Sequence, residues 1–297
     1  MDLIENVNLL EPNLAEFIGI ARKNAEDVDV CPITLPSGGW VIIREQNGDD
    51  DGIVSNASLQ KDASSINLFV AAIVAYSPLA KNKDNMLTLD EVLSMPVRDK
   101  YAIIIKSRIF SMGNLLEFTY IWDDSEGIPD NYEEDLMRFI WDYSSDFPHE
   151  PKDKDYDAER VATYKVKPDV EGWIYMDTQG KVGLNVNALS PDPNYKRLKF
   201  KLLDGFAERK LLVMGESGMS INTKFQMREL HTFIGGIWYK VESFKSFKPK
   251  EMATIRKVIA DYDHEYEGNS IITNPRTDAS VVIPLMSIPS FFFPQGI

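Results

Sequence analysis

The spacing of apolar residues constrains this chain most, because it changes from helical spacing to short β-rich runs along the sequence. One helix is predicted over 64–76, where apolar residues share one face, and a longer one over 97–112. Pro96 opens that longer helix and Gly113 is a natural stop for it. A helical part is therefore expected in the first 112 residues.

Strands are predicted in two places. Near the N-terminus, the apolar runs 30–35 and 40–43 flank the turn Pro36-Ser37-Gly38-Gly39, which indicates a β-hairpin. From residue 160 onward, short β-rich pieces separated by turn residues dominate. The predicted fold class is therefore α+β: a helical part with an N-terminal β-hairpin, then a mixed, mostly β middle.

A last helix is predicted over 249–266, where Pro249 lies in the first turn and apolar residues form one stripe. We expect this C-terminal helix to pack back on the N-terminal helices. The stripe consists of Met252, Ile255, Ile259, Tyr262 and Tyr266.

Charge and cysteine content exclude several classes of protein. With 46 acids and 32 bases, the 297-residue chain has a net charge of -14, which disfavours binding to a phosphate backbone or an anionic membrane. No run of about 18 apolar residues is present, so no membrane span is expected. The single cysteine, Cys31, allows neither an intramolecular disulfide nor a Cys-rich zinc site. The default expectation is a soluble, acidic, intracellular protein.

Candidate catalytic and metal sites are weak. The string Asn47-x-Asp49-x-Asp51-Gly52 copies half of a calcium loop, but its twelfth place holds Ser58, which favours loop residues and helix-capping acids instead. Cys31 lies in a predicted buried strand, and no nucleophile elbow or histidine pair at metal-ligand spacing occurs. We therefore predict no enzymatic activity, no cofactor and no metal.

An acidic and aromatic segment over 123–157 is the first candidate for binding a partner, since it holds 13 acids and three bases. Its acids most simply form a solvated face, and paired carboxylates for magnesium or acid–base chemistry are the alternative. As a docking surface for a basic partner, the segment would use aromatic anchors. The candidate residues here are Trp122, Asp123, Asp124, Trp141 and Tyr143.

Three consecutive aromatic residues, Phe291, Phe292 and Phe293, are the second candidate. They either fill a groove on their own domain, which is the favoured interpretation, or form an exposed patch that anchors a partner.

Five stretches of the sequence carry a resemblance to a known family. They are 35–39 with 41–44, 46–51 running into Ser55-Asn56, 95–113, 247–256, and 281–285 with 291–294. They resemble the tail-assembly chaperone and baseplate-hub assembly proteins of contractile-tailed phages, the T-even-type baseplate family. The resemblance covers about half of the chain, over 30–122 and 244–294.

The chain departs from the family where many members carry a zinc ribbon with Cys-x-x-Cys knuckles. The first knuckle position here reads Tyr120 to Gly127, and the second reads Asn274-Pro275-Arg276-Thr277-Asp278, without metal ligands at either place. The resemblance implies a ribbon-shaped hairpin that persists without metal and is held by packing alone, with Trp122 and Trp141 as fillers. It also implies that 1–122 and 244–297 form one discontinuous α+β assembly domain, with 123–243 as an acidic, β-rich insertion.

The function that the resemblance implies is tail and baseplate morphogenesis without catalysis. The chain is expected to act as a chaperone in the host cytoplasm, where it binds tail hub or tape-measure proteins and neither nucleic acid nor membrane. One alternative is a structural baseplate or hub component retained in the virion. The other alternative is an acidic module that binds a host protein by mimicking nucleic acid.

Overall fold

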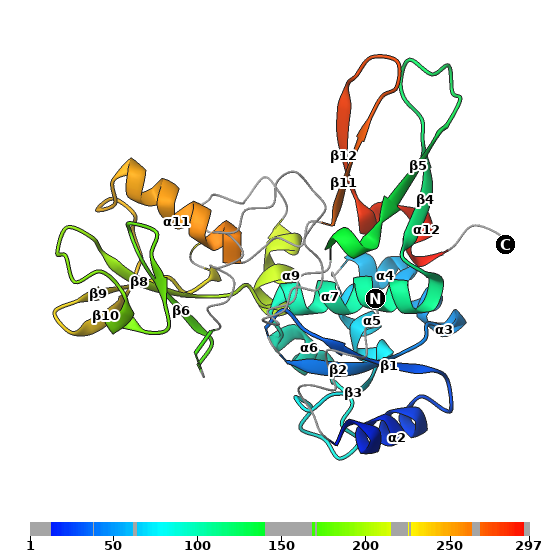
Figure 1. The fold of residues 1–297 in the computed structure, drawn as a ribbon, viewed down its shortest axis with the longest axis horizontal. Coiled ribbons are helices and arrows are strands. Elements are labelled where there is room, and N and C mark those ends of the chain that lie inside the picture. Colours follow the sequence, from blue (N-terminus) through cyan, green and yellow to red (C-terminus); the bar gives the residue numbers. More distant parts are fainter. Residues whose placement is uncertain are drawn as a thin grey trace.

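The computed structural model describes residues 13–37, 39–61, 64–139, 168–169, 171–214, 225, 227–262 and 268–293. Helices and strands both contribute to it, which confirms the predicted α+β class (Figure 1). The described residues form two lobes. The first lobe consists of 13–139 and 268–293, and the second lobe of 168–262. No helix among these residues is long and apolar enough to cross a membrane.

A three-stranded antiparallel sheet forms the base of the first lobe. Strands β1 (Val30–Thr34) and β2 (Trp40–Arg44) form the predicted hairpin, and β3 (Val74–Tyr76) pairs with β2. Helix α2 (Leu14–Asn24) covers one face of this sheet, where Phe17 stacks on Tyr76 with 5.0 Å between ring centroids.

Helix α7 (Val97–Met112) runs through the middle of the first lobe (Figure 1). It begins after Pro96 and ends at Gly113, whose φ of 84° suits glycine, as predicted. Its residues are buried on several sides, including the consecutive Ile103, Ile104 and Ile105. The neighbouring helices are α3 (Gly48–Val54), α4 (Ala57–Lys61), α5 (Ser65–Ile73) and α6 (Leu89–Ser94).

The second lobe is built on a five-stranded antiparallel sheet with strand order β10-β9-β8-β6-β7. The apolar residues of one sheet face, such as Ile174 and Phe200, face helix α11 and form a core of their own. The strands are β6 (Trp173–Asp177), β7 (Val182–Gly183), β8 (Arg197–Lys201), β9 (His231–Ile234) and β10 (Ile237–Lys240).

Helix α11 (Pro249–Tyr262) corrects one prediction, since it packs on this sheet and not on the N-terminal helices. Its stripe residues Met252, Ile255 and Ile259 are buried in the core of the second lobe. The sequence shows that the helix has an apolar face, but it does not show which of two apolar surfaces that face covers.

The segment that does return to the first lobe is 268–293. Strands β11 (Asn269–Thr273) and β12 (Ser280–Pro284) form a hairpin, and α12 (Pro289–Phe292) follows it. Ile272, Phe291 and Phe292 are buried in the core that also contains α5 and α7 residues. A second hairpin, β4 (Leu115–Tyr120) with β5 (Asp130–Asp135), pairs across the predicted boundary at 122/123.

The junction of the lobes is a short, tightly fitted contact. Helix α9 (Gly205–Met214) of the second lobe lies against α6, and the Val97 amide donates to the Leu203 carbonyl at 2.8 Å. A Cβ on Gly205 would lie 2.9 Å from both the Leu93 Cα and the Lys100 Nζ, so glycine permits this approach. Lys100 is fully buried and bonds to Asn67 and Glu208, which ties the two lobes together.

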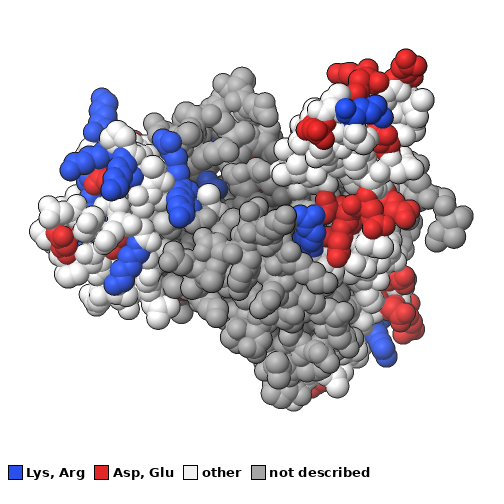
Figure 2. Space-filling model, turned by 45° about the horizontal axis from the view of Figure 1, so that its top comes forward, with Lys and Arg blue, Asp and Glu red and all other residues white. Residues whose placement is uncertain are grey.

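Charge is divided unequally between the lobes. The described residues of the first lobe include 21 acids and 12 bases, whereas those of the second lobe include ten acids and 14 bases. Figure 2 shows this division, with Lys and Arg gathered on the second lobe at left and most Asp and Glu at right. The net charge of the whole chain therefore does not describe the surface of the second lobe.

Candidate functional site

The two hairpins β4–β5 and β11–β12 stand side by side and project from the first lobe (Figure 1). They contain both segments that the sequence analysis compared with zinc knuckles, 120–127 and 274–278. Contacts between side chains about 150 positions apart in the chain join the hairpins. We refer to this unit as the twin hairpins.

Trp122 lies inside the twin hairpins, directly after β4. It is 9% exposed, and its Nε1 donates to the Tyr132 hydroxyl at 2.8 Å. That hydroxyl in turn donates to the Thr273 carbonyl of the other hairpin at 3.2 Å. Trp122 therefore holds the two hairpins together, as a filler does, and offers little surface to a partner.

Arg276 connects the tips of the hairpins. Its guanidinium donates two hydrogen bonds to the Asp130 carboxylate, at 2.8 and 3.3 Å, and its Nε lies 3.5 Å from Asp124. Asn274 adds a hydrogen bond of 2.9 Å from its Nδ2 to Asp124. Polar contacts thus occupy the place where the resemblance implies packing alone, and that expectation was incomplete.

A buried carboxylate links the bases of the hairpins. Glu134 is 6% exposed and accepts a hydrogen bond of 2.6 Å from Ser270 Oγ on β11. Arg138, in the 3-10 helix Leu136–Phe139 that follows β5, donates to its other oxygen at 2.8 Å. Both oxygens of this acid are occupied by side chains, so Glu134 helps to hold the two hairpins together.

The carboxylate of Asp124 provides a direct test of the tip contact. The hydrogen bond from Asn274, and then the Arg276 guanidinium, lower the pKa of Asp124 below its ordinary value. Its contribution to stability is therefore present above the ordinary aspartate pKa and disappears as the pH falls through the lowered one. We expect the Asp124 carboxyl carbon, followed by NMR, to titrate below the ordinary value.

In the Arg276→Gln variant the midpoint for Asp124 is expected to rise toward that ordinary value, because one favourable charge is removed. Equal midpoints in the two proteins would contradict the contact.

The other predicted partner-binding residues lie in different environments. Asp123 is exposed at the tip, while Trp141 and Tyr143 lie outside the described residues. Phe291 and Phe292 are 0% and 5% exposed in the first core, which corrects their assignment as partner anchors and agrees with the favoured buried tail. Phe293 is partly buried beside them. Burial of two of these rings leaves almost no surface for a partner.

The twin hairpins carry exposed apolar side chains that the sequence patterns above did not predict. Ile121 and Ile128, which flank the acidic turn, are 57% and 66% exposed. On β11 and β12, Ile271 and Val282 are directly opposite each other and are 68% and 57% exposed. The alternation of inward and outward residues along each strand would have predicted the second pair, once the register was known.

The chain matches no family model, no curated protein and no solved structure. Among the described residues, no three His, Cys, Asp or Glu side chains come together as metal ligands would. Cys31 is buried in β1, as predicted, and His231 stacks edge-on against Trp173, while His149 and His264 lie outside the described residues.

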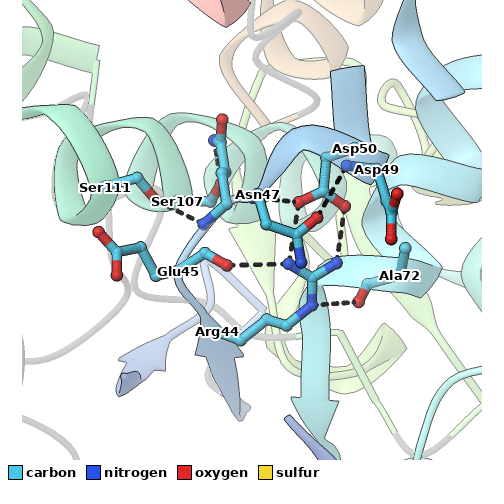
Figure 3. Close-up of polar contacts among 9 residues, drawn as sticks. Arg44, Glu45, Asn47, Asp49, Asp50, Ala72, Ser107 and Ser111 are labelled. Carbon is cyan, nitrogen blue, oxygen red and sulfur yellow. Dashed lines mark hydrogen bonds and ion pairs between the residues drawn. The ribbon is translucent and has the colours of Figure 1, made fainter. Parts of the chain in front are cut away.

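The string that resembles half of a calcium loop forms a helix N-terminus instead (Figure 3). Asn47 Oδ1 accepts from the Asp49 amide at 3.0 Å, and Asp50 accepts from the Asn47 amide at 2.9 Å, which completes a capping box. Asp50 also forms a two-pronged ion pair with Arg44, at 2.6 and 2.9 Å. The prediction of helix-capping acids is confirmed for Asp50, while Asp49 and Asp51 lie in the first turn of the helix.

Proposed function

We propose that this chain is a non-catalytic morphogenesis protein of a contractile-tailed phage, which binds tail hub or tape-measure proteins during assembly. The observation that carries the proposal is the pairing of 120–127 with 274–278 at the tips of the twin hairpins. These are the two positions at which the phage family places its zinc knuckles. Their contact supports the proposal, because the resemblance implies that a ribbon persists at these positions without metal.

The surface of the twin hairpins supports a binding role. Exposed Ile121 and Ile128 lie beside the acids Asp123 and Glu126, so the tip combines apolar area with charge. Protein interfaces use such apolar contacts for affinity and surrounding charges for orientation and rate of association. We place the client-binding surface at this tip.

Affinity capture tests the proposal. The tagged chain is captured from infected cells, the bound proteins are identified by mass spectrometry, and purified virions are inventoried in parallel. Tail hub or tape-measure proteins in the capture, with the chain absent from virions, would support the chaperone. The chain at fixed stoichiometry in virions would instead indicate a structural baseplate component. A basic host protein as the sole partner would overturn both.

A matched pair of variants tests the location of the binding surface. Ile128→Ser removes an exposed apolar side chain from the tip, and Leu79→Ser removes one from a loop elsewhere in the first lobe, where Leu79 is 51% exposed. We expect Ile128→Ser to lose most of the captured client and Leu79→Ser to keep it. Both variants should remain folded, because substitutions at exposed positions change the free energy of unfolding little. Equal capture by both variants would place the binding surface elsewhere.

A further inference from the structure

The sheet of the second lobe has a basic and aromatic face on the side away from α11. On β8, Arg197, Lys199 and Lys201 alternate with the core residues Leu198 and Phe200, so all three cations share this face. Strand register places Trp173 beside Lys201 and Tyr175 beside Lys199. His231 and Lys240 continue the same row across β9 and β10. We call this surface the basic sheet face.

Aromatic rings hold these cations in place. The Lys199 ammonium lies 4.0 Å from the centroid of the Trp173 ring and 5.1 Å from that of Trp238, and the Arg197 guanidinium lies 4.8 Å from that of Phe233. Among the described residues, no carboxylate lies within ion-pair distance of Arg197 or Lys199.

Acids of the same lobe offset only part of this charge. Glu229 pairs with Lys201, and Asp169, which accepts from the Tyr175 hydroxyl, interacts electrostatically with Lys199. Arg197 has no ion-pair partner among the described residues, so the face keeps positive charge for a partner.

The cations also cover the rings. Trp173 is only 8% exposed, with Lys199 and Lys201 both over its ring. Stacking of nucleic-acid bases needs free ring faces, and the covered ring of Trp173 does not provide one. The arrangement favours a partner that presents carboxylates on its surface.

Such a surface exists on the first lobe of the same chain, on the outer face of the β4–β5 hairpin. Glu117 and Glu133 are exposed and directly opposite each other in the register of the two strands. Directly opposed like charges destabilise a strand pair, and in the described structure neither carboxylate has a Lys or Arg within ion-pair distance. Asp123 and Glu126 extend the negative charge toward the tip.

We propose that the basic sheet face of one copy of this chain binds the outer face of the β4–β5 hairpin of a second copy. The two surfaces lie in different lobes, well apart in Figure 1, so each is presented to another molecule. The net charge of -14 does not prevent this contact, because charges separated by more than about 10 Å are largely screened at 0.1 M salt. The inference does not depend on the proposed function.

The contact is head-to-tail, since each copy uses two different surfaces. Such an interface leaves one basic and one acidic surface free on every dimer, so association continues into a ring or a chain. The wild-type chain is therefore expected to form species larger than a dimer at about 0.1 M salt. It is expected to return to a monomer at about 1 M salt, because the screening length falls to about 3 Å there.

Two double variants isolate the two surfaces. Arg197→Gln with Lys199→Gln neutralises the basic sheet face, and Glu117→Gln with Glu133→Gln neutralises the acidic face. We expect the dissociation constant for self-association to rise at least about tenfold in each variant alone. An equimolar mixture of the two is expected to stop at a dimer, because only one competent interface remains. Analytical ultracentrifugation measures all four samples.

The free energy of unfolding is measured separately, so that a loss of association can be distinguished from a loss of folding. The glutamine pair on β4–β5 removes a like-charge repulsion, so its free energy of unfolding is expected to equal or exceed that of the wild type. A monomeric wild type at about 0.1 M salt, or a mixture of variants that fails to dimerise, would overturn the proposal. So would a monomeric wild type that binds oligothymidylate through Arg197 and Lys199, which would assign the face to single-stranded nucleic acid.

Discussion

Replacing Glu208 by glutamine is expected to lower the free energy of unfolding by about 3 kcal/mol, because it leaves the buried ammonium of Lys100 without its carboxylate. The Lys100 side chain is 0% exposed and that of Glu208 is 14% exposed. The remaining partner, Asn67 Oδ1 at 2.8 Å, is neutral and compensates only part of the charge. Chemical denaturation followed by tryptophan fluorescence measures the change.

Lys210→Gln is the control for this prediction, since Lys210 is an exposed residue on the same helix, α9. Removal of an exposed charge changes stability by no more than about 0.5 kcal/mol. Equal effects of the two substitutions would show that Lys100 does not depend on Glu208, and that the junction of the lobes is held by its backbone contacts alone.

Phe291→Ala is expected to lower the free energy of unfolding by about 3–5 kcal/mol, the usual cost of removing a phenyl ring from a packed core. Phe291 is 0% exposed, and its ring packs edge-on against Phe292 with 4.9 Å between centroids. Phe292 in turn contacts Phe69 of α5 at 5.5 Å. Loss of the ring therefore opens a cavity between the C-terminal segment and the helices of the first lobe.

Phe206→Ala makes the same chemical change at a side chain that is 49% exposed, and it is expected to cost less than about 1 kcal/mol. If Phe291 were a surface anchor for a partner, its replacement would leave stability unchanged and abolish client capture. Thermal or chemical denaturation of the purified variants separates the two cases before any partner is known.

Local signals in the sequence were sufficient for several elements. The turn Pro36-Ser37-Gly38-Gly39 between two apolar runs predicts the β1–β2 hairpin, and Pro96 and Gly113 give both ends of α7. In each case the physical cause lies within a few residues of the element, so the chain carries the information locally.

Long-range pairing was not predictable in the same way. The stripe on α11 fits either core, and the choice depends on how the strands of the second lobe assemble. Trp122 and Phe291 were predicted as partner-binding residues, but apolar residues of this kind serve a core or an interface equally well. Lys100 gave no signal at all, because a buried lysine and a surface lysine look alike in a sequence.

The discontinuity of the first lobe determines when its core can form. Synthesis supplies the described core residues of the second lobe by residue 259, whereas the described core of the first lobe also includes Ile272, Phe291 and Phe292. Domains generally fold as units as the chain emerges. The lobe in the middle of the sequence is therefore free to fold first, while the helices made before it must remain incompletely packed until its synthesis is over. Such a delay exposes α5 and α7 to other proteins for as long as translation of 140–292 takes.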